Sequence, residues 1–295
     1  MRVLIGGGSG FVGGALTHLL RSKGHEVQHV SRDPRAGVTW AQLVSKGLPT
    51  CDAVVNVAGA NVLSPLRRWD AEYEAEVQSS RLETTRTLRD AIIRARSPPH
   101  AWVLLTGVGY YRPSLSQEYN EESAGGDFEF MSRLVRDWEG AARLPEETGR
   151  SVRQVVVRSG VVLGKNGGAL KWMLWPFRLG LGGSLGSGRQ PFPWIHVDDL
   201  SGILLHAMEG STVHGILNGV APCLSTNAEF VGTLARCLGR PALLPVPGGV
   251  LQALLGPQRA SMLLEGQWVV PQRTLESGYR YHFPQLAAAL KDLVS

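Results

Sequence analysis

Cysteine is scarce in this sequence, and its cysteines are not spaced for a metal site. Cys51, Cys223 and Cys237 are an odd number and lie far apart, so we expect neither a disulfide framework nor a bound metal. The eight histidines form no paired-ligand motif either. So few thiols suit a reducing intracellular compartment. We therefore expect a cytoplasmic protein, and an organellar location is left open.

Long apolar runs and runs of like charge are also missing. The apolar stretches are short or interrupted by glycine and proline, so none is expected to span a bilayer. The net charge of +5 is mild, and lysine and arginine are scattered along the chain, which argues against a nucleic-acid surface. A predicted strand begins at residue 2, so we expect no signal or transit peptide. The expected partner is a small-molecule substrate, with neither nucleic acid nor membrane; the oligomeric state is open.

The clearest positive signal is a glycine-rich turn over residues 6–13, GGGSGFVG. It follows an apolar strand predicted over 2–5 and precedes a segment with apolar residues at helical spacing. Strand, turn and helix in this order suit a dinucleotide pyrophosphate, because glycine lets the backbone approach and the helix N-terminus offers N–H groups. The motif can be read from Gly7 or from Gly8. We assign to the cofactor site Gly7, Gly10, Phe11, Val12 and Gly13.

The end of the next predicted strand, 25–30, indicates which dinucleotide is bound. An acidic residue there would bind a ribose 2′-hydroxyl and repel a 2′-phosphate. Ser31 and Arg32 instead offer a hydroxyl and a guanidinium, which suit phosphate oxygens. The sequence therefore favours NADP(H) over NAD(H). Asp33 leaves the alternative open, because a shift of one residue in the strand end would restore an acid.

A further buried strand is predicted over 52–59, and it closes on small residues. Val57, Ala58 and Gly59 let the backbone pass close beneath a flat ligand, so we add them to the cofactor site. With these features the chain resembles the extended, epimerase-like short-chain dehydrogenases/reductases. In that superfamily a Thr-Gly-x-x-Gly-x-x-Gly turn opens the chain and an Asn-x-Ala-Gly-like bend follows the fourth strand. Here Gly6 stands where threonine is usual.

The resemblance implies an α/β fold, a doubly wound parallel sheet of the NAD(P)-binding Rossmann type with a small C-terminal substrate lobe. The expected Rossmann domain is 1–165, completed by roughly 192–218. The substrate-side lobe is expected to consist of 166–191 and 219–295. The cofactor is expected across the carboxyl ends of the strands, where the strand order reverses.

The resemblance also implies further contacts. On a helix expected over 67–95, Arg81 stands where the superfamily has a cofactor-facing asparagine, and Glu76 precedes it by a turn and a half. Both are candidate cofactor contacts, although ordinary surface charges explain them nearly as well. Residues 155–164 resemble the Arg-Pro-x-x-Val-Tyr-Gly stretch after the sixth strand of the superfamily, which lies near the nicotinamide. Arg158 is therefore a third candidate contact. Thr106 ends the strand that carries the catalytic serine or threonine of the superfamily.

The Tyr-x-x-x-Lys pair of the superfamily is missing. On a helix expected over 128–143, one alignment puts Met131 and Val135 at these positions, and a shift of one residue puts Phe130 and Leu134 there. The proton donor must then lie elsewhere, and we expect Thr106 with Tyr110 or Tyr111 to assist. The predicted function is an NADP-dependent oxidoreductase. The alternatives are a sugar-nucleotide epimerase and a non-catalytic NADPH-binding or sensor protein.

Residues 194–199, WIHVDD, match the Ile-His-Val-Asp-Asp signature of the superfamily. We expect Asp198 or Asp199 to cap the next helix, and His196 to bridge the two lobes without a catalytic role. The stretches 262–267 and 270–271 resemble the C-terminal lobe of an atypical branch, family 39U of the short-chain dehydrogenases/reductases. That resemblance spans essentially the whole chain. The bacterial sugar-nucleotide epimerase-like proteins are less similar.

Overall fold

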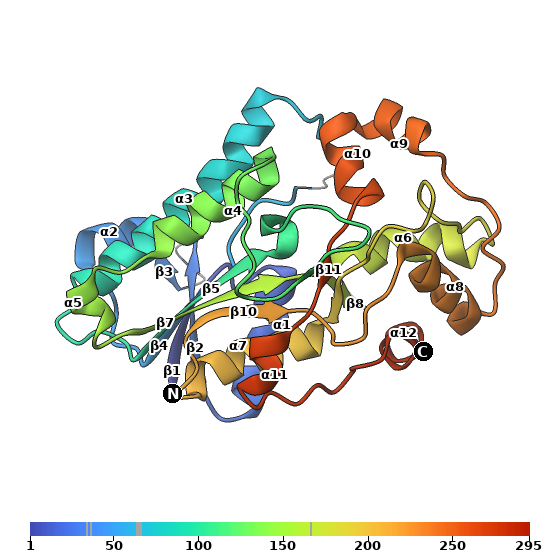
Figure 1. The fold of residues 1–295 in the computed structure, drawn as a ribbon. Coiled ribbons are helices and arrows are strands. Elements are labelled where there is room, and N and C mark those ends of the chain that lie inside the picture. The colour runs from blue at the N-terminus through green and yellow to red at the C-terminus, as the bar shows by residue number, and fades with distance from the viewer. Residues whose placement is uncertain (34, 36, 63–66, 166) are drawn as a thin grey trace.

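The central element is a parallel sheet of seven strands in the order β10-β7-β5-β4-β1-β2-β3 (Figure 1). The computed structural model describes residues 1–33, 35, 37–62, 67–165 and 167–295. The sheet order reverses between β1 and β4, which are neighbours. The predicted doubly wound Rossmann-type fold is therefore confirmed. The strands are β1 (Arg2–Gly6), β2 (Glu26–Ser31), β3 (Val38–Thr39), β4 (Ala53–Asn56), β5 (Ala101–Gly107), β7 (Arg153–Ser159) and β10 (Gly215–Gly219).

Helices cover both faces of this sheet, because its inner strands are apolar on both sides. Along β1, Val3 and Ile5 face one core and Leu4 faces the other. The first core is closed by α1 (Phe11–Ser22) and α7 (Val197–Glu209). The second is closed by α2 (Trp40–Lys46), α3 (Ala71–Ile93) and α4 (Phe130–Ala142). The short η2 (Val108–Tyr110) follows β5, and α5 (Glu146–Gly149) follows α4.

A third core holds a lobe beside the carboxyl ends of the strands, on the right in Figure 1. Leu170, Phe177, Trp194, Phe230 and Leu290 belong to this core. Two short strand pairs lie beside the main sheet, β8 with β9 and β6 with β11. The segment 179–188 contains no helix and no strand. The remaining helices and strands are β6 (Glu118–Tyr119), β8 (Val161–Gly164), α6 (Gly168–Arg178), β9 (Trp194–His196), α8 (Asn227–Leu238), α9 (Gly248–Leu255), α10 (Pro257–Leu264), β11 (Trp268–Val269), α11 (Gln272–Glu276) and α12 (Leu286–Val294).

The prediction that Asp198 or Asp199 caps α7 is wrong. His196 is the N-cap, and its Nδ1 accepts a hydrogen bond from the Asp198 N–H at 3.1 Å. This fits a neutral ring, since burial lowers the pKa of His196. Asp199 is fully buried and accepts hydrogen bonds from the N–H groups of His282 and Phe283 at 2.7 and 2.8 Å. The signature therefore ties the C-terminal segment to α7, and His196 helps by stacking on Phe283 at 4.0 Å.

Among the described residues, no helix combines the length and the apolar character needed to cross a membrane.

Candidate functional site

A pocket of about 230 Å³ lies at the carboxyl ends of β4 and β5. It brings together several of the residues predicted from the sequence, since Val57, Ala58, Gly59, Arg81 and Thr106 all line it. These residues come from two strand ends and from α3. The pocket therefore lies beside the reversal of strand order, where ligands of open α/β sheets bind.

The glycine turn adjoins this pocket, and two of its glycines are required by the backbone itself. Gly7 has φ +82°, and a Cβ there would lie 2.7 Å from the Ala58 Cα. A Cβ on Gly13 would lie 2.2 Å from the carbonyl oxygen of Gly7. Gly10 differs from both, because its Cβ would meet only that same oxygen, at 3.3 Å. The space beside Gly10 is thus left open by the protein, as a site for an approaching pyrophosphate requires.

The helix that follows the turn presents a free N-terminus. Its N-cap is Gly10, which has no side chain to cap the helix, and the first turn contains no acidic residue. The first N–H groups of α1, on Phe11, Val12 and Gly13, therefore suit an anion. The ring of Phe11 packs on the start of the lobe, since a Cβ on Gly167 would lie 2.4 Å from it. Phe11 can thus serve a cofactor through its backbone, while its ring holds the lobe in place.

The end of β2 shows which charged side chains stand where the adenosine ribose is expected. The strand ends at Ser31, and the Asp33 carboxylate is held by Arg35, whose Nε and Nη2 donate at 3.1 and 3.0 Å. These bonds lower the pKa of Asp33, so it stays ionised but paired. Arg32 is exposed and forms no hydrogen bond or ion pair with the residues that the structure describes. The free charge at this strand end is therefore positive, which fits a 2′-phosphate.

A buried asparagine that the sequence analysis did not single out shapes the bend after β4. Asn56 is fully buried, and its Oδ1 accepts a hydrogen bond from the Ala58 N–H at 3.1 Å. Its Nδ2 donates to the Thr85 hydroxyl at 2.8 Å, and Trp138 Nε1 donates to the same oxygen at 2.8 Å. These bonds fix the bend against α3 and α4. The Asn-x-Ala-Gly-like motif was the signal that could have identified Asn56.

Of the two charges predicted on α3, only Arg81 reaches the pocket. Its guanidinium donates to the carbonyl oxygens of Val77 and Ala60, both at 3.0 Å, and lies 5.2 Å from the centre of the Trp138 ring. Burial lowers the pKa of Arg81 to about 10, so it remains charged at neutral pH. Glu76 is exposed and pairs with Arg67 at 3.0 Å. Glu76 does not line this pocket, and its assignment to the cofactor stays a prediction.

Thr106 joins the pocket to a buried ion pair. Its hydroxyl donates to Glu139 Oε1 at 3.2 Å. Arg158 donates two hydrogen bonds to the same carboxylate, from Nε at 2.8 Å and from Nη2 at 2.7 Å. Arg158 is only 4% exposed; burial opposes its charge, but the bonds to Glu139 raise its pKa. Arg158 thus pairs with the carboxylate that accepts the Thr106 hydrogen bond, and its role as a cofactor contact stays a prediction.

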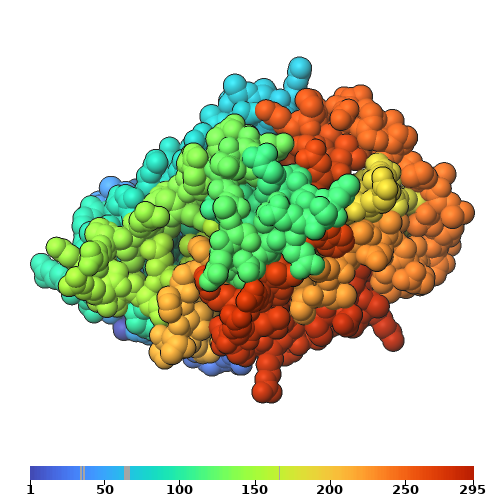
Figure 2. Space-filling model, in the orientation of Figure 1, coloured from blue at the N-terminus to red at the C-terminus, as the bar shows by residue number. Residues whose placement is uncertain are grey.

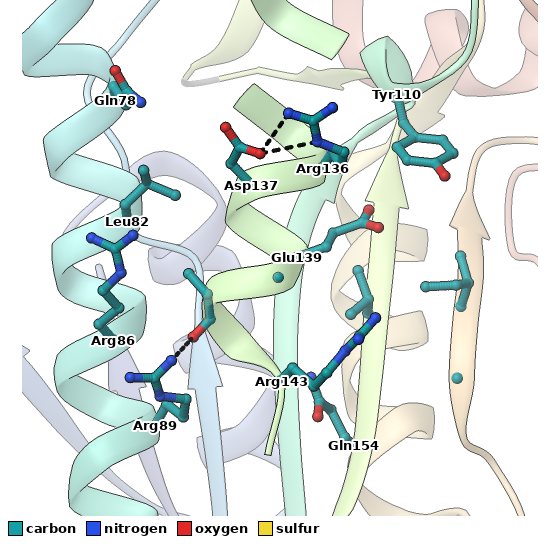
Figure 3. Close-up of a pocket in the computed structure, with 15 residues that line it drawn as sticks. Gln78, Leu82, Arg86, Arg89, Tyr110, Arg136, Asp137, Glu139, Arg143 and Gln154 are labelled. Atoms are coloured by element: carbon teal, nitrogen blue, oxygen red, sulfur yellow. Dashed lines mark hydrogen bonds and ion pairs between the residues drawn. The ribbon is translucent and has the colours of Figure 1, made fainter. Parts of the chain in front are cut away.

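Neither predicted tyrosine lines the pocket. Tyr111 is fully buried, and its hydroxyl donates to Asn218 Oδ1 at 2.9 Å and accepts from Arg158 Nη1 at 3.0 Å. The Tyr110 ring stacks on Arg158 at 3.5 Å and borders a separate groove of about 870 Å³ beside α4. Figure 3 shows Glu139 pointing from α4 toward Tyr110. The proposed role of either phenol as a proton donor therefore stays a prediction, and neither hydroxyl lies in the wall of the Thr106 pocket.

The wall that faces Thr106 is apolar. Met131 and Val135, one of the two alignments of the missing pair, both line the pocket from α4. Leu134, from the alternative alignment, lies between them on the same wall. No phenol or ammonium group therefore stands on this face of α4. Nor do the described residues contain a cluster of His, Cys, Asp and Glu that could hold a metal ion.

Comparisons with known proteins agree with this architecture. Residues 3–128 match the model of the NAD dependent epimerase/dehydratase family, and residues 246–293 match a domain of unknown function, DUF1731. The chain is 62% identical to the human epimerase family protein SDR39U1, over 100% of both chains. A crystal structure of that human protein (isoform 2) with NADPH has a TM-score of 0.97, at 61% identity and 99% coverage of both chains. UDP-N-acetylglucosamine 4-epimerase from Bacillus cereus shares the fold alone, with a TM-score of 0.76 at 16% identity over 99% of this chain and 98% of that one.

Proposed function

This chain belongs to the NAD-dependent epimerase/dehydratase family, and from that premise we propose that it binds NADPH and reduces a small carbonyl substrate. The observation that carries the proposal is the position of Thr106, a hydroxyl in a pocket at the strand ends beside the glycine turn. NADPH, when bound, supplies a hydride. The protein's own residues then have to bind the cofactor, exclude water and handle one proton.

The residues present fit NADPH. The open side of Gly10 and the uncapped N-terminus of α1 suit the pyrophosphate, and Arg32 with Ser31 suits the 2′-phosphate. The solved human relative with NADPH supports the same choice. Arg81 places a positive charge in the pocket from α3 and is the cation that could take the part of the missing lysine.

Arg32→Ala is expected to erase most of the preference for NADPH over NADH. A charge-assisted hydrogen bond contributes about 1.5–3 kcal/mol, so the wild type should prefer NADPH by roughly 10–150-fold. Calorimetric titration of both cofactors measures the ratio. The matched control is Arg96→Ala, which removes an exposed arginine between α3 and β5, at the amino ends of the strands, and should leave the preference unchanged. Equal affinities in the wild type would contradict the assignment of Arg32.

The proposed role of Thr106 follows from its hydrogen bond. Because its proton points to Glu139, the lone pairs of its oxygen are available to a donor in the pocket. To protonate a substrate oxygen, the Thr106 O–H must turn from Glu139 to that oxygen, and the hydroxyl must regain a proton. Glu139 accepts this hydrogen bond and is paired with Arg158, so the proton has to come from solvent water. The groove beside α4, which Glu139 also borders, is the proposed route for that water. The apolar wall at Met131 and Val135 offers no donor to this step from α4.

A non-catalytic NADPH-binding role is the second candidate, and the same apolar wall favours it. Met131 and Val135 remove the acid/base pair on which reversible oxidation of a sugar would depend. The missing pair also argues against a sugar-nucleotide epimerase. The fold shared with UDP-sugar epimerases is compatible with a non-catalytic role, because fold does not fix function.

Turnover against a panel of small carbonyl compounds distinguishes these functions, with NADPH consumption as the measurement. We expect slow reduction of one class of carbonyl compound and no epimerisation of nucleotide sugars. Thr106→Val should lower kcat by about 100-fold or more, because it keeps the shape and removes the hydroxyl, whereas Thr106→Ser should retain activity. NADPH affinity should change little in either variant. Tight NADPH binding with no turnover of any compound would instead favour the sensor role.

A further inference from the structure

The lobe beside the cofactor pocket carries an apolar stripe on its surface. Trp172, Trp175 and Leu179 are 61%, 70% and 64% exposed. They follow one another at helical spacing along α6 and the residue after it, so they form one stripe. The opposite face of α6 is buried through Leu170, Leu174 and Phe177. The helix is therefore held in the lobe by one apolar face and presents a second apolar face to solvent.

The stripe continues onto a neighbouring segment. Gly180 packs against Pro241, and the Leu244 N–H donates to the Gly182 carbonyl oxygen at 3.1 Å. Leu181, Leu243 and Leu244 are 55%, 79% and 52% exposed. Figure 2 shows the yellow segment near 180–190 seated among the orange residues of this lobe. Six large apolar side chains are thus exposed at one end of the molecule, where a solvated surface would carry few.

The chain segments that form this apolar surface carry basic residues and no acidic residue. No aspartate or glutamate occurs between Glu147 and Asp198, or between Glu229 and Glu265. These two segments contain α6, the 179–188 loop, most of α8, α9 and α10. Their exposed charged residues are Arg150, Lys165, Lys171, Arg178, Arg189, Arg236 and Arg240. Tryptophan and leucine flanked by lysine and arginine are the residues that enter the interface of an anionic bilayer.

We propose that the α6 surface, defined by Trp172, Trp175, Leu179, Leu181, Leu243 and Leu244, docks the protein on an anionic phospholipid bilayer. The aromatic and leucine side chains enter the interfacial layer, and the surrounding lysines and arginines contact lipid phosphates. A second copy of this chain fits the same surface poorly. An isologous contact would bring two sets of basic residues together without an acid from these segments to pair them. The proposal concerns adsorption, which needs no spanning helix.

The test is co-sedimentation of the full chain with vesicles, and it needs neither NADPH nor a substrate. One set of vesicles is phosphatidylcholine alone, and in the other phosphatidylserine replaces part of it. We expect binding to the second set, a blue shift of tryptophan emission on binding, and loss of binding at high salt.

Two double variants measure the apolar and the electrostatic contributions to vesicle binding. Trp172→Ser with Trp175→Ser should lower vesicle binding by roughly tenfold or more, because it removes the apolar area that enters the interface. Lys171→Glu with Arg178→Glu should lower it by at least about 25-fold, since each basic residue near such a surface contributes about fivefold. The controls are Val44→Ser, at a side chain 59% exposed on α2, and Lys23→Glu with Lys46→Glu. Both controls should bind as the wild type does.

Three results would overturn the proposal. The protein could stay in the supernatant with both kinds of vesicle, it could bind both kinds equally, or the tryptophan variant could bind as well as its control. A protein that ignores vesicles but self-associates through these tryptophans would identify a protein interface instead.

Discussion

Gly10→Val is expected to abolish NADPH binding in a protein that still folds. The valine side chain would occupy the open space beside the turn, where the pyrophosphate approaches the N–H groups of α1. Overpacking costs roughly 1–3 kcal/mol, and each lost charge-assisted hydrogen bond adds about 1.5–3 kcal/mol, so affinity should fall by more than about 100-fold. NADH should be lost equally, since both cofactors share the pyrophosphate. Calorimetric titration measures both affinities.

The control for this variant is Gly14→Val, one turn further along α1. A Cβ on Gly14 meets no atom within 4 Å, and the residue is exposed. Its substitution changes the same helix without entering the turn, so cofactor affinity should stay within a few-fold of wild type. Circular dichroism checks that both variants are folded. A folded Gly10→Val protein with native NADPH affinity would show that the pyrophosphate lies elsewhere.

Asp199→Ala is expected to lower the free energy of unfolding by about 3–5 kcal/mol. The carboxylate is fully buried and accepts hydrogen bonds from two backbone N–H groups and from the Tyr279 hydroxyl. Removing it leaves these donors buried without partners, and the segment that leads into α12 loses its attachment to α7. Denaturation by urea, with the midpoint and the slope both fitted, measures the loss.

Asp198→Ala provides the matched control at the adjacent position. The Asp198 side chain is 66% exposed, and it lies 3.7 Å from the His196 ring, which is held neutral by burial. An exposed contact of this kind contributes at most about 1 kcal/mol. If the two alanine variants lost equal stability, the buried carboxylate would not be what holds the C-terminal segment.

The signals from which the sequence predicts the fold and the cofactor are local ones. The glycine turn, the small residues after β4 and the Ser31–Arg32 pair each sit within a few residues of a strand end. Their position in the fold then follows from the strand order alone. The absence of the tyrosine–lysine pair was also visible, because the expected helix formed as α4 and carried Met131 and Val135 to the pocket wall.

The surroundings that could not be predicted belong to side chains whose partners are distant along the chain. Tyr111 bonds to Asn218, 107 residues away, and Asp199 bonds to Phe283, 84 residues away. Arg158 on β7 pairs with Glu139 on α4, and the same carboxylate accepts the hydrogen bond of Thr106. No local pattern distinguishes an arginine that faces a ligand from one that faces a buried carboxylate.

The sequence by itself thus determined the family, the parallel sheet, the turn at which a dinucleotide pyrophosphate is expected and the missing acid/base pair. Each of these depends on backbone conformation and on the spacing of apolar residues, which neighbours along the chain dictate. The tertiary structure decided which polar groups remain free in the pocket and which apolar groups remain exposed. The expectation of no membrane partner depended on the lack of a spanning run, whereas the α6 surface arises from residues that helix packing leaves uncovered. Burial and pairing are properties of the packed chain, because each side chain is satisfied or left free by residues that only folding brings beside it.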